Sequence, residues 1–109
     1  QNSHIPTLIF DEVDVGIGGA TADTVGALLK TLGEKGQIIS VTHQAQVAAH
    51  ARAHYKARKI VDGSATISTI ETLDSKKRVE ELARMLGGAV ITENTRRHAS
   101  ELFQLAMSK

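Results

Sequence analysis

The sequence contains no cysteine, no tryptophan and only one proline. Without cysteine, neither a disulfide framework nor a thiolate metal site can form, and no charged-then-apolar leader stands at the start of the chain, so we expect a cytoplasmic protein. No apolar run approaches the roughly 18 residues that a membrane-spanning helix needs, which predicts a soluble protein with no membrane partner.

The sequence also lacks a clear excess of either positive or negative charge. The 13 basic and 12 acidic side chains leave a net charge of +1, which gives no overall attraction to nucleic acid. The chain is 41% apolar and 23% charged, a mixture that excludes a disordered sequence. A protein of 109 residues has a modest core, so we expect one domain over 1–109 with room for one site.

Two short apolar segments, 7–10 and 37–41, are typical of strands buried on both faces of a parallel sheet. Between them, apolar residues recur at helical spacing from Thr21 onward, and Gly33 and Gly36 supply a stop. A strand, a helix and a strand in about 35 residues predict a βαβ unit with a right-handed crossover.

The remainder predicts a short helix over 44–51, a β-hairpin over 54–61 and 65–72 with its turn at Asp62 and Gly63, and two amphipathic helices. The apolar residues that define these two helices are Val79, Leu82, Ala83, Leu86, Ala99, Leu102, Phe103 and Ala106. The expected fold class is α/β, with a parallel βαβ core followed by a β-hairpin and two helices.

Two parallel strands make an incomplete sheet, because such sheets usually have five or six strands and cover on both faces. Since no methionine precedes Gln1, we expect a missing amino-terminal portion to supply the other strands. The open edge should encourage self-association.

Adjacent carboxylates, Asp11 and Glu12, follow the first apolar segment. In nucleotide hydrolases, the first carboxylate at such a strand end orders the magnesium shell and the second orients the attacking water. The alternative is a strand followed by a solvated acidic loop. Thr42 and His43 follow the second strand, and an imidazole there could donate to a phosphate oxygen or could simply be a surface residue.

Other nucleotide-binding, hydrolase and metal-binding motifs fit the sequence less well. A dinucleotide fingerprint that begins at Gly16 and Gly18 would need glycine where Thr21 stands, and there is no GxxxxGK[ST] loop and no GxSxG elbow. A zinc site at His43, His50 and His54 lacks convincing spacing, so we expect these histidines to face solvent.

No acidic residue lies between Glu34 and Asp62, whereas basic residues are frequent there. Candidates for contact with a DNA backbone are Arg52, Lys56, Arg58 and Lys59. The alternative is a solvated edge strand that its positive charges protect from aggregation.

Three strings, TLIFDEVDVGIGGATAD, QIISVTHQAQVAAHA and KKRVEELARMLGG, cover much of the chain. Together they closely resemble the carboxyl-terminal part of a bacterial DNA repair family in the SMC-like branch of the ABC ATPases. The resemblance implies the carboxyl-terminal lobe of a P-loop NTPase head that drives DNA double-strand break repair and recombination with ATP and Mg²⁺.

The resemblance also implies roles for single residues. Asp11 matches the Walker B aspartate that holds Mg²⁺ through water, Glu12 matches the catalytic glutamate, and His43 matches the switch histidine that contacts the γ-phosphate. Residues 15–19 match the D-loop, which crosses to the partner head. The expected nucleotide-side residues here are Asp14, directly before this loop, and Gly16, Gly18 and Gly19 within it. Gly18 stands where many relatives have aspartate, so Asp14 or the backbone would have to substitute.

In that family the Walker A loop, Q-loop, signature motif and coiled coil precede the Walker B strand, and none occurs in this sequence. We therefore expect a fragment that alone neither binds ATP tightly nor hydrolyses it. The implied partners are DNA, a second head of the same protein, the missing amino-terminal lobe and the bacterial recombinase machinery, in association with the nucleoid. Two alternatives stay open: a non-catalytic interaction module that keeps half of the fold, or another SMC-like ATPase.

Overall fold

The computed structural model describes residues 7–108, which form four strands and four helices. In chain order these are β1 (Thr7–Asp11), α1 (Gly19–Gly33), β2 (Gln37–Val41), α2 (Ala45–Ala48), β3 (His54–Asp62), β4 (Ala65–Leu73), α3 (Ser75–Gly87) and α4 (Glu93–Met107). The strands make two separate two-stranded sheets, β1 with β2 and β3 with β4. The mixed α/β architecture agrees with the predicted fold class.

The predicted βαβ unit is confirmed. Strands β1 and β2 pair in parallel, from Thr7 opposite Gln37 to Asp11 opposite Val41, and α1 connects them. Helix α1 begins at Gly19, two residues before the predicted start, because the carbonyl of Gly18 already accepts a hydrogen bond from the backbone N–H of Ala22.

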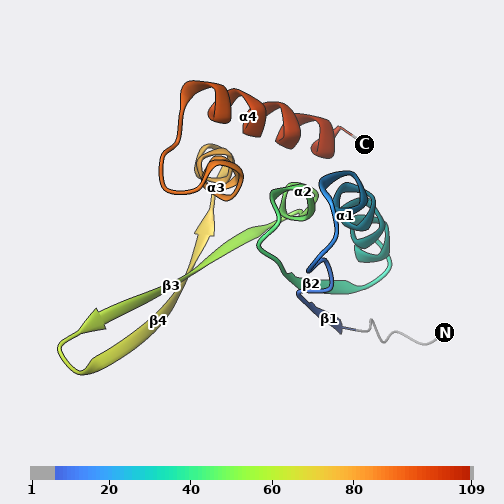
Figure 1. The fold of residues 1–109 in the computed structure, drawn as a ribbon. Coiled ribbons are helices and arrows are strands. Elements are labelled where there is room, and N and C mark those ends of the chain that lie inside the picture. The colour runs from blue at the N-terminus through green and yellow to red at the C-terminus, as the bar shows by residue number, and fades with distance from the viewer. Residues whose placement is uncertain (1–6, 109) are drawn as a thin grey trace.

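The expected burial of these strands on both faces is wrong for the described part of the chain. Ile9 is 68% exposed and its neighbour Ile39 is 44% exposed. In Figure 1, α1 and α2 lie on the same side of the β1–β2 pair, and no described element covers the other side. The apolar runs therefore predict the two strands correctly, but they do not predict how far the described residues bury them.

Strands β3 and β4 form the predicted antiparallel hairpin, which projects away from the rest of the molecule (Figure 1). Its turn is Gly63–Ser64, one residue later than predicted, because Asp62 is still paired with Ala65. Gly63 has a φ of 62°, a left-handed conformation that glycine adopts without steric cost. Most residues of the hairpin are exposed.

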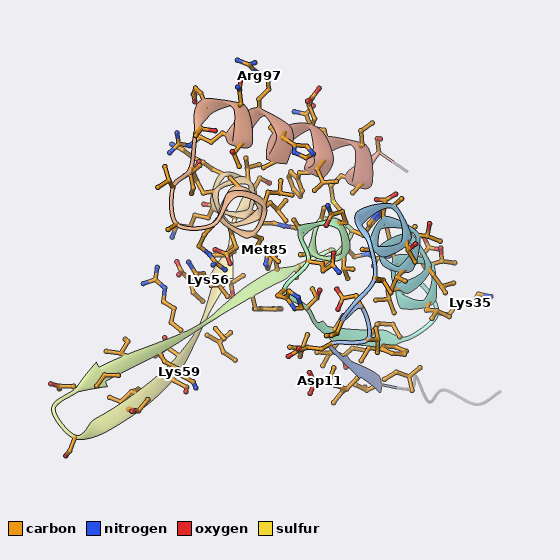
Figure 2. All side chains as sticks on the ribbon, viewed as in Figure 1. Asp11, Lys35, Lys56, Lys59, Met85 and Arg97 are labelled. Atoms are coloured by element: carbon orange, nitrogen blue, oxygen red, sulfur yellow. The ribbon has the colours of Figure 1, made fainter. Side chains whose placement is uncertain are left out.

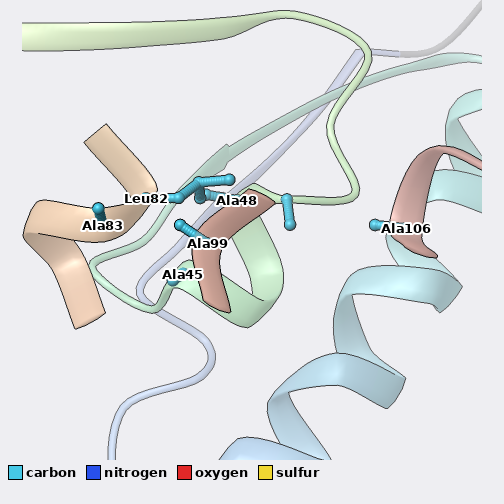
Figure 3. Packing of buried hydrophobic residues seen from close by; sticks show 7 residues of the cluster. Ala45, Ala48, Leu82, Ala83, Ala99 and Ala106 are labelled. Atoms are coloured by element: carbon cyan, nitrogen blue, oxygen red, sulfur yellow. The ribbon is translucent and has the colours of Figure 1, made fainter. Parts of the chain in front are cut away.

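The core lies where α2, α3 and α4 meet, and most of its buried side chains are alanines (Figure 3). Its buried members are Ala45, Ala48, Ala49, Leu82, Ala83, Ala99 and Ala106. The two predicted amphipathic helices are confirmed, and each begins with a side-chain cap: Asp74 accepts from the N–H of Lys77, and Thr92 accepts from that of Thr95. Helix α2 is shorter than the predicted 44–51.

No helix in the described range 7–108 is both long enough and apolar enough to cross a membrane.

Candidate functional site

The parallel register brings the polar strand ends to one edge of the β1–β2 sheet. Asp11 lies opposite Val41, and the backbone N–H of Glu12 donates to the carbonyl of Val41 over 2.8 Å. The Asp11–Glu12 pair and the Thr42–His43 pair therefore follow neighbouring strands at the same edge. This shared edge follows from the parallel pairing, in which β1 and β2 end on the same side of the sheet.

Three of the predicted side chains at this edge, those of Asp11, Glu12 and His43, are exposed. Glu12 has a φ of 53°, the only positive φ among the described non-glycine residues, so the chain turns sharply as it leaves β1. Figure 2 shows Asp11 beside β1, below the helices in this view. A ligand could therefore reach this edge without displacing the helical core.

The loop after β1, residues 12–18, is attached to the segment after β2 through side-chain hydrogen bonds. The Thr42 hydroxyl donates to Asp14 Oδ2. Gln44 Nε2 donates to the carbonyls of Asp14, at 2.9 Å, and Ile17, at 3.0 Å. Gln44 also donates its backbone N–H to Thr42 Oγ1 over 3.0 Å. Gln44 is not among the site residues predicted from the sequence, where its one signal is its place directly after Thr42 and His43.

Asp14 has an inward orientation that its position in an acidic run does not reveal. The residue is 1% exposed, and its carboxylate is bonded to Thr42 rather than directed outward. In this conformation Asp14 holds the loop and does not present a carboxylate to a second molecule. Gly16, with a φ of 84°, and Gly18 have open space around them, so the backbone is accessible on that side of the loop.

The expectation that the histidines face solvent is wrong for His50. This side chain is 2% exposed, and its Nε2 lies 2.8 Å from Asp23 Oδ1. His54 is half-buried, and burial together with the nearby charge of Arg78 lowers its pKa. His43 is exposed as expected. Within residues 7–108 no three acidic, histidine or cysteine side chains are grouped so that they could hold a metal ion.

The basic residues of the hairpin do not form one patch. Lys56 and Arg58 share one face of the ribbon, where Lys56 Nζ lies 3.1 Å from Glu81 and Arg58 Nε lies 3.8 Å from Glu71. Lys59 belongs to the opposite face, because successive residues of a strand alternate, and Figure 2 shows it further out along the ribbon. Arg52 is exposed before the hairpin begins.

The Thr42–His43 side of the edge opens into a hollow of about 1150 Å³ between β2 and the base of the hairpin, whereas Asp11 and Glu12 are not among its lining residues. Thr42 and His43 line it beside apolar side chains from both sheets: Ile38, Ile39, Val41, Tyr55, Ala57 and Ile70. Three buried polar atoms of lining residues, Ser40 Oγ, His50 Nδ1 and His54 Nδ1, have no hydrogen-bond partner in the described part of the chain. Such atoms usually have a partner in a complete protein.

The edge fits one side of a nucleotide–magnesium site. Mg²⁺ is commonly held by one or two carboxylates, several waters and the phosphates themselves, so a single carboxylate such as that of Asp11 is a suitable protein contribution. Glu12 adds a second carboxylate and His43 a donor. The sequence has no GxxxxGK[ST] loop whose backbone N–H groups could cradle a triphosphate.

The fold defines the class of structures to which the chain is similar. The structure superimposes with a TM-score of 0.65 on a solved SMC ATPase structure described for ATP-driven dimerization and DNA-stimulated activation. The match covers 81% of this chain and 52% of that chain at 22% sequence identity, so this chain shares the fold of about half of that SMC ATPase structure.

Within this class the sequence is similar to the DNA repair protein RecN. It is 51% identical to RecN of Xylella fastidiosa strain 9a5c over 100 residues, which is 92% of this chain and 18% of that protein. RecN of Haemophilus influenzae is 47% identical over 96% of the chain, and RecN of Streptomyces coelicolor is 44% identical over 94%. The resemblance to RecN that the three sequence strings predict is thus confirmed. The chain spans less than a fifth of the length of these relatives, and no family model matches it.

Proposed function

We propose that residues 1–109 are the carboxyl-terminal lobe of an ATP-hydrolysing head that works in DNA repair. The observation that carries the proposal is the parallel register of β1 and β2, which places Asp11 and Glu12 beside Thr42 and His43 at one exposed edge. Similarity to RecN and to an SMC ATPase structure supports the same proposed function.

In the proposed mechanism each exposed side chain at the edge has one task. Asp11 would hold Mg²⁺, Glu12 would accept a hydrogen bond from the attacking water and orient it, and His43 would donate a hydrogen bond to the γ-phosphate. The magnesium ion, when bound, neutralises charge that develops on the phosphates. Catalysis by these residues is a matter of positioning and electrostatics, since phosphoryl transfer to water needs no covalent bond to the protein.

The rest of the proposed site comes from outside the chain. An amino-terminal lobe filling the hollow beside β2 would bring the phosphate cradle next to His43 and cover the apolar lining. A second head would meet the loop of residues 15–19, whose exposed backbone lies at Gly16 and Gly18. DNA, and through it the recombination machinery, would be partners of the whole protein. Of the four basic candidates, Arg52 and Lys59 are better placed to contact DNA than Lys56 and Arg58, which are already near carboxylates.

The proposal is tested by Glu12→Gln in a full-length RecN protein whose carboxyl-terminal segment is this chain. Loss of the carboxylate should lower the ATP turnover number by roughly 10²- to 10⁴-fold while ATP still binds, so that ATP-bound dimers accumulate. Turnover is measured by phosphate release and dimers by sedimentation velocity. Glu34→Gln, at the exposed end of α1, is the matched control and should behave as wild type. Normal turnover in the Glu12 variant would remove this residue from the proposed role.

A second test uses the 109-residue chain alone. Because its edge is half of a site, the isolated chain should show neither micromolar ATP affinity by calorimetry nor measurable hydrolysis. Either activity would contradict the assignment of the phosphate cradle to another lobe.

A further inference from the structure

The hydrogen bonds from Gln44 to the loop after β1 are shorter than the hydrogen bonds that the loop makes within itself. Within residues 12–18, the backbone N–H of Val15 reaches the carbonyl of Glu12 over 3.3 Å, and that of Ile17 reaches Asp14 over 3.4 Å. Both distances lie beyond the usual range of about 2.7–3.2 Å. The two hydrogen bonds from Gln44 Nε2, at 2.9 and 3.0 Å, are shorter than either.

The loop has little apolar packing that could replace these bonds. Val13 and Val15 are more than half exposed, and Gly16 has no neighbour on its open side. Asp14 is the buried anchor of the loop, and its carboxylate depends on the Thr42 hydroxyl. Between its two ends, where Glu12 is bonded to Val41 and Gly18 to Ala22, the loop is held by two residues from the segment after β2, which flank His43 on either side.

The chemistry of the contact requires an amide at position 44. The side-chain nitrogen of glutamine carries two N–H donors, and both are used here, one for each loop carbonyl. Thr42 links the same residues a second time, since its hydroxyl donates to Asp14 and accepts the backbone N–H of Gln44. Glutamate at position 44 would have the same shape but would place an acceptor against two acceptors.

We infer that Gln44 is a positioning residue that couples His43 to the loop of residues 12–18. The inference rests on the proposed function, in which His43 meets the γ-phosphate and the loop meets a second head. Gln44 itself contacts neither. A shift of His43 toward the phosphate moves Thr42 and Gln44 with it, and their hydrogen bonds carry the loop along. The loop in turn leads directly into α1, where the carbonyl of Gly18 accepts the first helical hydrogen bond.

The experiment uses a full-length RecN protein that carries this chain, with Gln44→Glu as the principal variant. Because the coupling affects the reacting geometry and not the contacts that bind ATP, kcat should fall at least tenfold while KM for ATP stays within about twofold. Thr42→Val, which keeps the shape but loses the hydroxyl, should lower kcat in the same way. Thr42→Ser keeps the hydroxyl and should retain most of the activity. Gln104→Glu, exposed on α4, is the matched control.

Amide hydrogen–deuterium exchange on the same proteins separates coupling from general damage. Gln44→Glu should raise exchange in residues 12–18 about tenfold and leave α3 and α4 as protected as in wild type. Unchanged kcat, or a loss of protection that extends through α3 and α4, would overturn the inference.

The proposed function is tested separately by Glu12→Gln. If that variant abolishes turnover and Gln44→Glu does not change it, the function stands and the coupling fails. If the wild-type protein shows no turnover at all, the proposed function fails, and local exchange in residues 12–18 alone then decides whether Gln44 holds the loop.

Discussion

At the scale of single residues, Arg78 on α3 connects three helices through one buried guanidinium. Its Nη2 donates to the carbonyls of Ala51, at 2.7 Å, and Ala48, at 3.3 Å, and its Nη1 donates to that of Arg52 at 3.3 Å. The cation also lies 4.6 Å from the centre of the Phe103 ring on α4. Burial lowers the pKa of Arg78, but a guanidinium stays protonated at any physiological pH. Arg78 of α3 therefore caps the carboxyl end of α2, the short helix that follows His43.

Replacing Arg78 by lysine should destabilise the protein although the charge is kept. An ammonium cannot reproduce the planar fork that reaches several carbonyls, so we expect a loss of about 1–3 kcal/mol in the free energy of unfolding. Urea unfolding followed by circular dichroism measures it. Arg97→Lys, exposed on α4 (Figure 2), is the control and should change stability by less than about 0.5 kcal/mol. Equal stability of the two variants would contradict the capping role.

The exposed candidate residues were predictable from the sequence and the buried polar ones were not. Asp11, Glu12 and His43 follow apolar strands, and such strand ends meet at one edge of a parallel sheet. Gln44 and His50 carry no comparable signal. Their roles depend on which loop carbonyl or which carboxylate the fold brings opposite them, and that is decided by packing between segments roughly 30 residues apart.

At the scale of elements, α1 and α2 approach each other through a glycine. A Cβ atom added at Gly26 would lie 2.5 Å from His50 Cδ2 and 3.0 Å from the backbone carbonyl oxygen of Gln46. The imidazole of His50 occupies this space and reaches Asp23 on the same helix as Gly26. The absence of a side chain at position 26 thus leaves room for the buried imidazole of His50 and its contact with Asp23.

Gly26→Ala should separate α1 from α2 and reduce stability. Helix propensity alone would favour alanine by about 1 kcal/mol, but the clash is partly with backbone and overpacking costs about 1–3 kcal/mol, so we expect a net loss or at best no gain. Thermal unfolding measures the change. Gly18→Ala provides the comparison, because no atom lies within 4 Å of a Cβ there. A clear stabilisation by Gly26→Ala would show that the helices separate freely.

The hairpin is attached to α3 through titratable groups at its base. Glu81 is buried, accepts from Arg84 at 2.5 Å and lies 3.1 Å from Lys56 Nζ. Burial raises the pKa of Glu81, but the hydrogen bonds from Arg84 and Lys56 outweigh it and leave the pKa below its usual value. His54 at the start of β3 has a lowered pKa, so the folded protein holds this imidazole neutral over a wider pH range than the unfolded chain does.

Acidification should therefore weaken the wild-type protein more than a His54→Gln variant. The folded state binds fewer protons at position 54 than the unfolded state does, so stability is present above pH about 6.5 and declines as the pH falls toward the folded-state pKa. Urea midpoints measured from pH 8 to pH 5 for both proteins test the sign. A pH dependence that is identical in the two proteins would contradict it. His98→Gln, at an exposed position on α4, should leave the wild-type dependence intact.

The type of every described helix and strand was predictable, either from a short apolar run or from its periodicity and turn residues. Three boundaries were not, the first being the start of α1 at Gly19. Helix α2 ends at Ala48 rather than Ala51, and the following carbonyls bond to Arg78 instead of continuing the helix. The hairpin turn falls at Gly63–Ser64 because the strand pairing extends through Asp62, which a dipeptide signal cannot reveal.

At the scale of the whole molecule, the β1–β2 sheet presents one apolar face outward. Ile9 and Ile39 are neighbours in the parallel register, and Val41 follows on the same face two residues later. All three are more than 40% exposed, and the hollow beside them is lined by further apolar side chains of the hairpin. Both outer edges of this sheet also lack a strand partner within the described residues. A protein that works alone rarely leaves such a surface uncovered.

The isolated chain should consequently associate with itself through this face, and polar substitution there should weaken the association. Ile39→Lys places a charge where a second sheet would pack, and losing the burial of one isoleucine, about 1.5–3 kcal/mol, corresponds to roughly tenfold or more in the dissociation constant. Light scattering over a wide concentration range measures the effect. Leu105→Lys removes an exposed apolar side chain of α4 instead and should leave association unchanged. A strictly monomeric wild-type chain would show that this apolar face is stable in water, which would remove the physical argument for a covering lobe. An equal effect of Leu105→Lys and Ile39→Lys would show that association does not depend specifically on the sheet.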